Sequence, residues 1–211
     1  MCSFLNELGL ANTILLDLTR DMWAYISLGY FKQRTIEGEV GSSTMPHKVN
    51  PIAFENGEGN LGLANAVATH LVNKLPISRY QRDLSDSTVL RNSGVAFAYS
   101  IIAYENILVG LNKVTVNEEA LSTELSNHWE VLAEPVQQMM RKYPIANPYE
   151  LLKKHTRGKK VTEKRMKGLI SELKKDMSEG DWLRLDELTP ENYIGNAAEM
   201  AAKCGEYCDE E

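Results

Sequence analysis

Helical periodicity is the feature that most limits what this chain can become. Between Leu10 and Tyr30, apolar side chains recur every three or four residues, which places them on one side of a helix. The same spacing returns from about Pro51 to Asn73, and again from a start near Ser87 to about Leu111. Strict alternation of apolar and polar residues is nowhere long enough to require a sheet. The pattern predicts an all-α fold built on long helices.

The helical segments become shorter after Lys113, which predicts a second, smaller helical domain. We therefore expect residues 1–112 to form one domain of long bundle helices and residues 113–211 to form the other. Pro135 is expected to kink one of the shorter helices, and Thr189 followed by Pro190 predicts the start of the last one. The predicted short helices cover residues 117–126, 129–142, 148–155, 162–175 and 189–208.

The apolar stripes of the three long helices are wide. Residues such as Leu15, Leu61 and Phe97 lie on well-separated turns, and three helices cannot cover all of this surface among themselves. We therefore expect the helices to find further partners in an oligomer.

The charge balance argues against a protein dedicated to binding nucleic acid. The chain has 23 Lys and Arg against 29 Asp and Glu, a net charge of −6. A protein that neutralises phosphates along a duplex needs the opposite excess. A small metabolite is the better predicted partner.

The lengths of the apolar runs and the number of cysteines indicate the cellular compartment of the chain and the redox state of its thiols. The apolar runs fall short of the roughly 20 consecutive residues of a membrane span, and the first residues lack the basic region of a secretory signal. These observations predict a cytoplasmic chain with no membrane partner. The cysteines, Cys2, Cys204 and Cys208, are an odd and sparse set that suits reduced thiols.

The segment from Gly41 to Pro51 carries the strongest chemical signal. It places hydroxyls, one lysine and one asparagine on a glycine-containing loop just before a helix, where donors converge on anions. A pair of serines or a lone lysine in a loop is usually only solvated. The complete string, Gly-Ser-Ser-Thr-Met-Pro-His-Lys-Val-Asn-Pro, is far more specific.

This string resembles the signature of the fumarase and aspartase superfamily. His47 and the downstream run from Arg79 to Asn92 are similar to the bacterial type of the adenylosuccinate lyase family, and the likeness continues through Thr189 to Gly195. Members of that family are about twice as long, so residues 1–112 would be the C-terminal part of the family's central helical bundle, including the signature loop.

The resemblance implies a β-elimination. Members of the family cleave adenylosuccinate to AMP and fumarate, and also cleave the succinylated carboxamide ribotide earlier in purine synthesis. It implies no cofactor, and a homotetramer whose active sites draw residues from several subunits. The family's general acid is a histidine of the N-terminal half, which this sequence lacks, so the fragment alone is expected to be inactive and His47 to shape the loop.

The family's site residues can be carried over by position. Ser42 matches the catalytic base, whose alkoxide needs nearby positive charge and backbone N–H donors. Lys48 and Asn50 match contacts to the succinyl carboxylates, and Ser43 is placed to add a hydroxyl. Asn56 matches a further substrate contact.

Arg82, Ser87 and Arg91 are the candidates for binding the nucleotide. Ser87 and Arg91 are four residues apart at a predicted helix start, so they share a face that could hold a phosphate. Without the resemblance, Arg82 and Arg91 could equally be surface ion-pair partners of Asp83 and Asp86.

Other candidates are weaker, and two alternative functions stay open. His70, His128 and His155 are dispersed and Cys204 and Cys208 lack further ligands, so no metal site is predicted. The basic block between residues 153 and 175 reads as a solvated face rather than an RNA-binding patch. The alternatives are a fumarate-forming lyase acting on argininosuccinate or aspartate, and a non-catalytic helical assembly module.

Overall fold

The structure is a computed structural model that describes residues 1–34, 50–158 and 161–206. The chain divides into two compact units, Met1–Glu118 and Glu119–Glu211, and each is described by itself.

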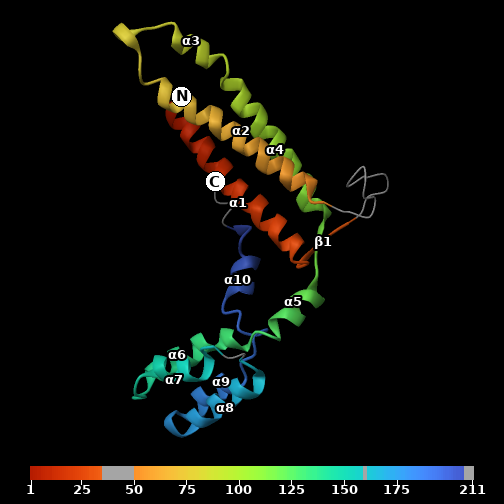
Figure 1. Cartoon of the computed structure of the whole chain (residues 1–211), viewed down its shortest axis with the longest axis vertical. Helices are drawn as coiled ribbons and strands as arrows, with labels where there is room; N and C mark the ends of the chain where they lie inside the picture. Colours follow the sequence, from red (N-terminus) through yellow and green to blue (C-terminus); the bar gives the residue numbers. More distant parts are fainter. Residues whose placement is uncertain (35–49, 159–160, 207–211) are drawn as a thin grey trace. The chain divides into compact units, whose positions relative to one another are not determined.

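Unit 1 is built from three long helices, α1 (Cys2–Ser27), α2 (Ile52–Lys74) and α4 (Ser93–Lys113). They run in alternating directions, and α2 packs against both of the others (Figure 1). The predicted helix after Pro51 is confirmed almost to the residue, because Pro51 is its N-cap. The first helix begins at Cys2 rather than near Leu10. It ends before Tyr30 because Gly29 adopts a positive φ of 79°, the usual way to leave a helix.

Small residues let the long helices approach closely. Ala64, Ala68, Ala96 and Ala103 are at most 2% exposed. At one end of the bundle, the ring of Phe54 fills the space above Gly110, where a Cβ would lie 2.8 Å from the ring. The core therefore combines large side chains with alanine and glycine on the facing helix. Its largest fully buried apolar members are Phe54, Leu5, Leu61 and Leu71.

The connection between α2 and α4 corrects one prediction. It contains a 3-10 turn, η1 (Arg79–Gln81), and a short helix, α3 (Ser85–Leu90). Ser87 therefore lies inside the short helix α3, and the long helix α4 starts later, at Ser93, than the predicted start near Ser87. Helix α3 begins at Ser85, with Leu84 as its N-cap, and Asp83 Oδ1 accepts the backbone N–H of Ser85 at 2.8 Å.

A small sheet closes the other end of unit 1. Strands β1 (Phe31–Gln33) and β2 (Val114–Val116) pair antiparallel, with Phe31 opposite Val116. No strand was predicted, because three residues are too few for alternation to be recognised.

Among the described residues, one segment is long and apolar enough to be a membrane span, judged by length and composition alone. Residues Ser85–Lys113 contain an 18-residue window with a mean hydropathy of 1.5, of which 28% is buried. The core helix of a bundle passes the same test, and α4 packs along α2 with Ala96, Ala103 and Ile107 buried.

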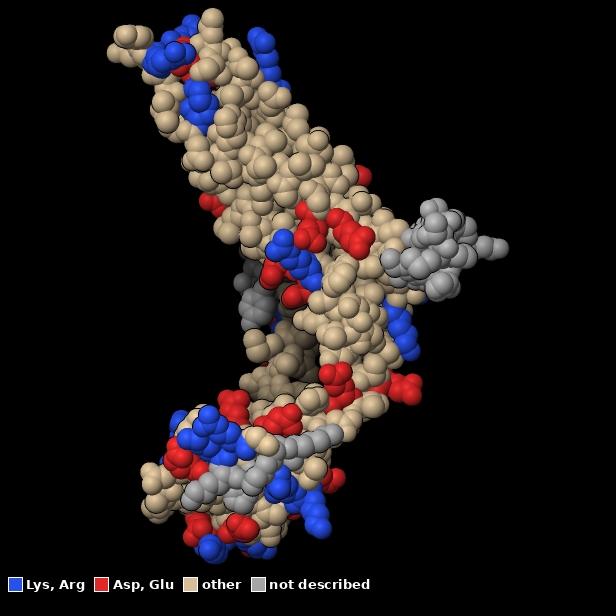
Figure 2. All heavy atoms as spheres, in the orientation of Figure 1, with Lys and Arg blue, Asp and Glu red and all other residues tan. Residues whose placement is uncertain are grey.

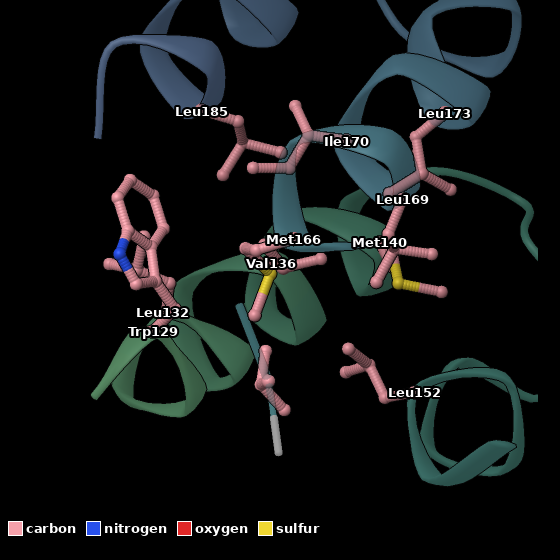
Figure 3. Close-up of a cluster of buried hydrophobic side chains, with 11 residues drawn as sticks. Trp129, Leu132, Val136, Met140, Leu152, Met166, Leu169, Ile170, Leu173 and Leu185 are labelled. Atoms are coloured by element: carbon pink, nitrogen blue, oxygen red, sulfur yellow. The ribbon is translucent and has the colours of Figure 1, made fainter. Parts of the chain in front are cut away.

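Unit 2 is a set of short helices around one core (Figure 3). Leu132, Val136, Met140 and Ile170 are completely buried, and Trp129 is 8% exposed. Pro135 lies in the first turn of α6, where proline is tolerated, so the predicted kink is instead a change from a 3-10 turn to an α-helix. The elements are α5 (Glu118–Leu125), η2 (Trp129–Leu132), α6 (Ala133–Lys142), α7 (Pro148–Thr156), α8 (Glu163–Leu173), η3 (Lys174–Asp176), α9 (Glu179–Asp186) and α10 (Ala197–Ala202).

The end of unit 2 differs from the prediction. No helix begins at Thr189, whose backbone N–H donates to Asn192 Oδ1 at 2.7 Å while its Oγ1 accepts the N–H of Asn192 at 3.2 Å. These bonds form a turn instead of a cap, and the remaining helix is only Ala197–Ala202. Helix α9 was missed, although Ser178 caps it by accepting the Asp181 N–H at 3.3 Å.

Candidate functional site

The predicted catalytic residue and its nearest neighbours lie outside the described residues. Ser42, Ser43, His47 and Lys48 all fall within residues 35–49, so their predicted roles remain predictions. The description resumes at Asn50, which is partly buried and directly precedes the N-cap of α2.

Asn56 lies in the early part of α2. The side chain of Asn56 is exposed, and the backbone carbonyl of Asn56 accepts a hydrogen bond from Asn60 Nδ2 at 2.8 Å. Asn50 and Asn56 thus lie at the same end of α2. The exposed amide of Asn56 is a hydrogen-bond donor that an anionic ligand can use.

Polar side chains tie α1 to this end of α2. Trp23 Nε1 donates to Glu55 Oε1 at 3.1 Å, and Arg20 Nε pairs with Glu58 Oε1 at 2.8 Å. They border an open pocket of about 350 Å³. None of these residues was singled out from the sequence, because partners that are 32 or 38 residues apart leave no local signal.

Arg82 lies in the connection that follows the other end of α2, and Ser87 and Arg91 lie on the segment that returns along the last turns of α2. All three are exposed, and Ser87 Oγ donates to the carbonyl of Leu84 at 2.9 Å. Arg91 follows the last turn of α3, so Ser87 and Arg91 keep their predicted spacing on one short helix. A helix of this length gives no N-terminal dipole site, and the guanidinium groups themselves must supply the attraction for an anion.

The alternative in which Asp83 and Asp86 neutralise these two arginines is wrong. Asp83 pairs with Arg79 at 3.2 Å, and Asp86 pairs with Lys74 at 2.6 Å. Among the residues that the structure describes, no carboxylate lies within ion-pair distance of Arg82 or Arg91. Both guanidinium groups therefore remain available to a ligand.

The end of unit 1 that carries η1 and α3 is locally basic. Residues 74–92 contain four lysines and arginines and only two carboxylates, in a chain whose net charge is −6. Figure 2 shows Lys and Arg side chains gathered at that end. Phosphate groups are the ligands that such exposed arginines favour.

A groove lies beside these residues, between α2 and the α3 to α4 segment. Its volume is about 380 Å³, and its lining is mainly apolar with polar groups from His70, Thr88 and Asn92. Within the described ranges, no group of three or more His, Cys, Asp or Glu is arranged to hold a metal ion.

The candidate residues are thus divided between opposite ends of one helix. Asn50 and Asn56 mark the beginning of α2, and Arg82 follows its end. At 1.5 Å per residue, the 23 residues of α2 span about 34 Å. One small ligand cannot contact both groups in a single chain.

Comparison with known families gives two matches. Residues 78–194 match the family described as "Adenylosuccinate lyase C-terminal", and residues 1–67 match the family described as "Lyase". All the candidate site residues lie within these two spans.

Curated relatives support the same assignment. The chain is 60% identical over 192 residues to an adenylosuccinate lyase of Haemophilus influenzae, covering 91% of this chain and 42% of the relative. It is 59% identical over 189 residues to an adenylosuccinate lyase of Escherichia coli K12, covering 90% and 41%. The chain therefore spans about two fifths of the length of the curated relatives it matches.

A solved structure shares the fold. The chain resembles the 3-carboxy-cis,cis-muconate lactonizing enzyme of Pseudomonas putida with a TM-score of 0.68 and 20% identity, covering 96% of this chain and 46% of that one. With the helices described above, this likeness confirms the prediction of an all-α fold.

Proposed function

Because the chain belongs to the adenylosuccinate lyase C-terminal family, we propose that it forms part of an enzyme that eliminates fumarate from adenylosuccinate and releases AMP. The same site would release fumarate from the succinylated carboxamide ribotide of purine synthesis. We further propose a cytoplasmic homotetramer, with no dependence on a cofactor.

The observation that carries the proposal is the identity to named relatives. Sixty per cent identity extends over 91% of this chain, and the two family matches include all the candidate residues.

Ser42 is the proposed base. Its alkoxide would take the proton from the carbon next to a succinyl carboxylate, and the electron pair would spread onto that carboxylate. The bond from the neighbouring carbon to nitrogen then breaks, and a general acid from outside this segment protonates the departing nitrogen. Lys48, Asn50 and Ser43 would stabilise the dianionic intermediate, and losing one such donor typically costs about 10² to 10³ in rate.

Arg82, Ser87 and Arg91 are the proposed contacts to the nucleotide, with the phosphate between the two guanidinium groups. The structure supports this role for the two arginines in part, because Asp83 and Asp86 pair with Arg79 and Lys74 and leave Arg82 and Arg91 available. Asn56 would add a substrate contact near the succinyl end.

The division of these groups along α2 supports a site assembled from several subunits. The long helices also expose apolar side chains that an assembly would bury, including Ile14 at 63%, Ile101 at 55% and Leu108 at 59% exposure. We expect the 211-residue chain by itself to show no turnover, because the proposed acid lies outside it.

The direct experiment assays a complete polypeptide that carries this segment, with adenylosuccinate as substrate. Ser42→Ala should lower turnover by about 10² or more while AMP still binds, and Ser171→Ala, an exposed serine of α8, should change neither. Turnover of argininosuccinate or aspartate instead would favour the rival lyases. Absence of turnover with every substrate would favour the assembly module.

A further inference from the structure

The turn that carries Arg82 has an unusual backbone. Tyr80 and Gln81 are consecutive residues with positive φ, at 50° and 71°, a backbone conformation that residues other than glycine rarely adopt. The side chain of Tyr80 is completely exposed, so it does not hold the turn by packing. Other contacts must keep this backbone in place.

Asp83 supplies those contacts on both sides of the turn. Its Oδ2 accepts the backbone N–H and the Nε–H of Arg79, each at 3.2 Å. Its Oδ1 accepts the backbone N–H of Ser85 at 2.8 Å and also the hydroxyl of Ser85. The Asp83 N–H in turn donates to Ser78 Oγ at 3.0 Å. One carboxylate thus fastens the residues that precede and follow Arg82.

Lys74 completes the cluster from the end of α2. Its Nζ donates to Asp86 Oδ1 at 2.6 Å and to the carbonyl of Ile77 at 2.8 Å, and lies 4.0 Å from Asp83 Oδ1. The side chains of Lys74, Asp83 and Asp86 are 22%, 13% and 26% exposed, so the cluster is largely shielded from solvent. The hydrogen bonds from Ser85 and Arg79 hold the pKa of Asp83 well below its usual range, so it stays ionised at neutral pH.

The arrangement separates two kinds of charge. The carboxylates turn inward to Lys74, Arg79 and backbone N–H groups, while the side chain of Arg82 is left exposed and unpaired within the described chain. The backbone of Arg82 is itself fixed, because its N–H donates to the carbonyl of Arg79 at 3.1 Å. An arginine whose backbone is already held in place loses less backbone freedom on binding a phosphate than one on a mobile turn.

We propose that Asp83 is a positioning residue, which holds the η1 turn so that Arg82 is preorganised to bind the phosphate of the nucleotide. This inference rests on the proposed function and adds to it a group that contacts no substrate. Asp83→Asn would keep an acceptor but place an amide N–H₂ against the donors of Arg79 or Ser85, which loosens the turn.

The test compares AMP with adenosine as inhibitors of a complete polypeptide that carries this segment. Asp83→Asn should raise the inhibition constant of AMP by about tenfold and leave that of adenosine within about twofold, because only AMP carries the phosphate. The KM for adenylosuccinate should rise similarly, with a smaller change in kcat. Asp17→Asn, an exposed aspartate of α1, is the matched control and should leave all these values unchanged.

A double-mutant cycle with Arg82→Ala separates positioning from a general loss of folding. If Asp83 acts through Arg82, Asp83→Asn should add little to the loss of AMP binding once Arg82 is removed. Should Asp83→Asn prove too unstable to purify, Ser85→Ala removes a single hydroxyl from the cluster and should weaken AMP relative to adenosine in the same direction.

Equal weakening of AMP and adenosine, or full additivity with Arg82→Ala, would overturn the inference while leaving the lyase activity intact. By contrast, a wild-type polypeptide that fails to convert adenylosuccinate would overturn the proposed function itself.

Discussion

Asn12 on α1 donates a hydrogen bond from Nδ2 to Ser100 Oγ on α4 at 2.9 Å, and both side chains are at most 1% exposed. The same Nδ2 reaches Asn65 Oδ1 on α2 at 3.1 Å, and Asn12 Oδ1 accepts the hydroxyl of Tyr104 at 2.5 Å. One buried amide therefore joins all three long helices of unit 1. Such a network is satisfied only when the helices have the correct rotation and register.

Replacing Asn12 by Ala should destabilise unit 1. The change leaves Tyr104 and Ser100 without their partner and opens a cavity, so we expect the free energy of unfolding to fall by about 1 to 3 kcal/mol. Urea denaturation of the purified chain measures it. Asn106→Ala, on the exposed side of α4, is the control and should cost under about 0.5 kcal/mol. Equal effects of the two changes would mean that the buried network adds nothing.

The contact between Gly110 and Phe54 predicts a steric limit. A Cβ at position 110 would lie 2.8 Å from the Phe54 ring, so Gly110→Ala should lower the free energy of unfolding by about 1 to 3 kcal/mol. Gly59 on α2 has no atom within 4 Å of an added Cβ, so Gly59→Ala should stabilise by about 0.5 to 1 kcal/mol. Relative to wild type, the urea midpoint is predicted to fall in Gly110→Ala and to rise in Gly59→Ala. Shifts in the same direction would contradict the close contact between Gly110 and Phe54.

A buried carboxylate should make unit 2 sensitive to acid. Asp181 accepts Lys142 Nζ and the Tyr143 hydroxyl, each at 2.5 Å, and these bonds lower the pKa of Asp181 from its ordinary value of 3.8. Because the folded pKa is the lower one, the ionised group stabilises the fold above about pH 4, and this contribution disappears as the pH falls further.

The test for Asp181 is the thermal unfolding midpoint of unit 2 at pH 7 and at pH 3. The fluorescence of Trp129 and Trp182 monitors the transition. Asp181→Asn should lower the midpoint at pH 7 and reduce the difference between the two pH values. Asp176→Asn, an exposed aspartate nearby in sequence, should leave that difference unchanged. An unaltered acid response in Asp181→Asn would show that other groups cause it.

The sequence predicted the long helices well because their stripes repeat over many turns. Helix α2 agrees almost to the residue, since Pro51 marks its start. The prediction of a helix from Thr189 failed because Thr189 has the side chain of a typical N-cap but forms hydrogen bonds with Asn192 in a turn. Helix α9 was missed because its eight residues offer few apolar positions, chiefly Trp182 and Leu185.

The candidate site could be predicted only in part. The string of residues 41–51 predicted catalytic residues that lie mostly outside the described residues, and spacing placed Ser87 and Arg91 together. The sequence left open whether Arg82 and Arg91 bind a nucleotide or pair with Asp83 and Asp86. In the structure Lys74 reaches both carboxylates across the turn, and no local pattern reveals a partner nine or twelve residues away.

The separation of the two groups along α2 yields the most direct test of the account. Complete polypeptides carrying Ser42→Ala and Arg91→Ala are each expected to be inactive with adenylosuccinate. If every site combines the loop of one subunit with the arginines of another, mixed oligomers contain some sites with neither change. We predict that co-expression of the two variants restores turnover well above that of either parent, while a mixture of Ser42→Ala with Ser42→Ala,Arg91→Ala stays inactive. Mixed oligomers that remain as inactive as their parents would contradict the account.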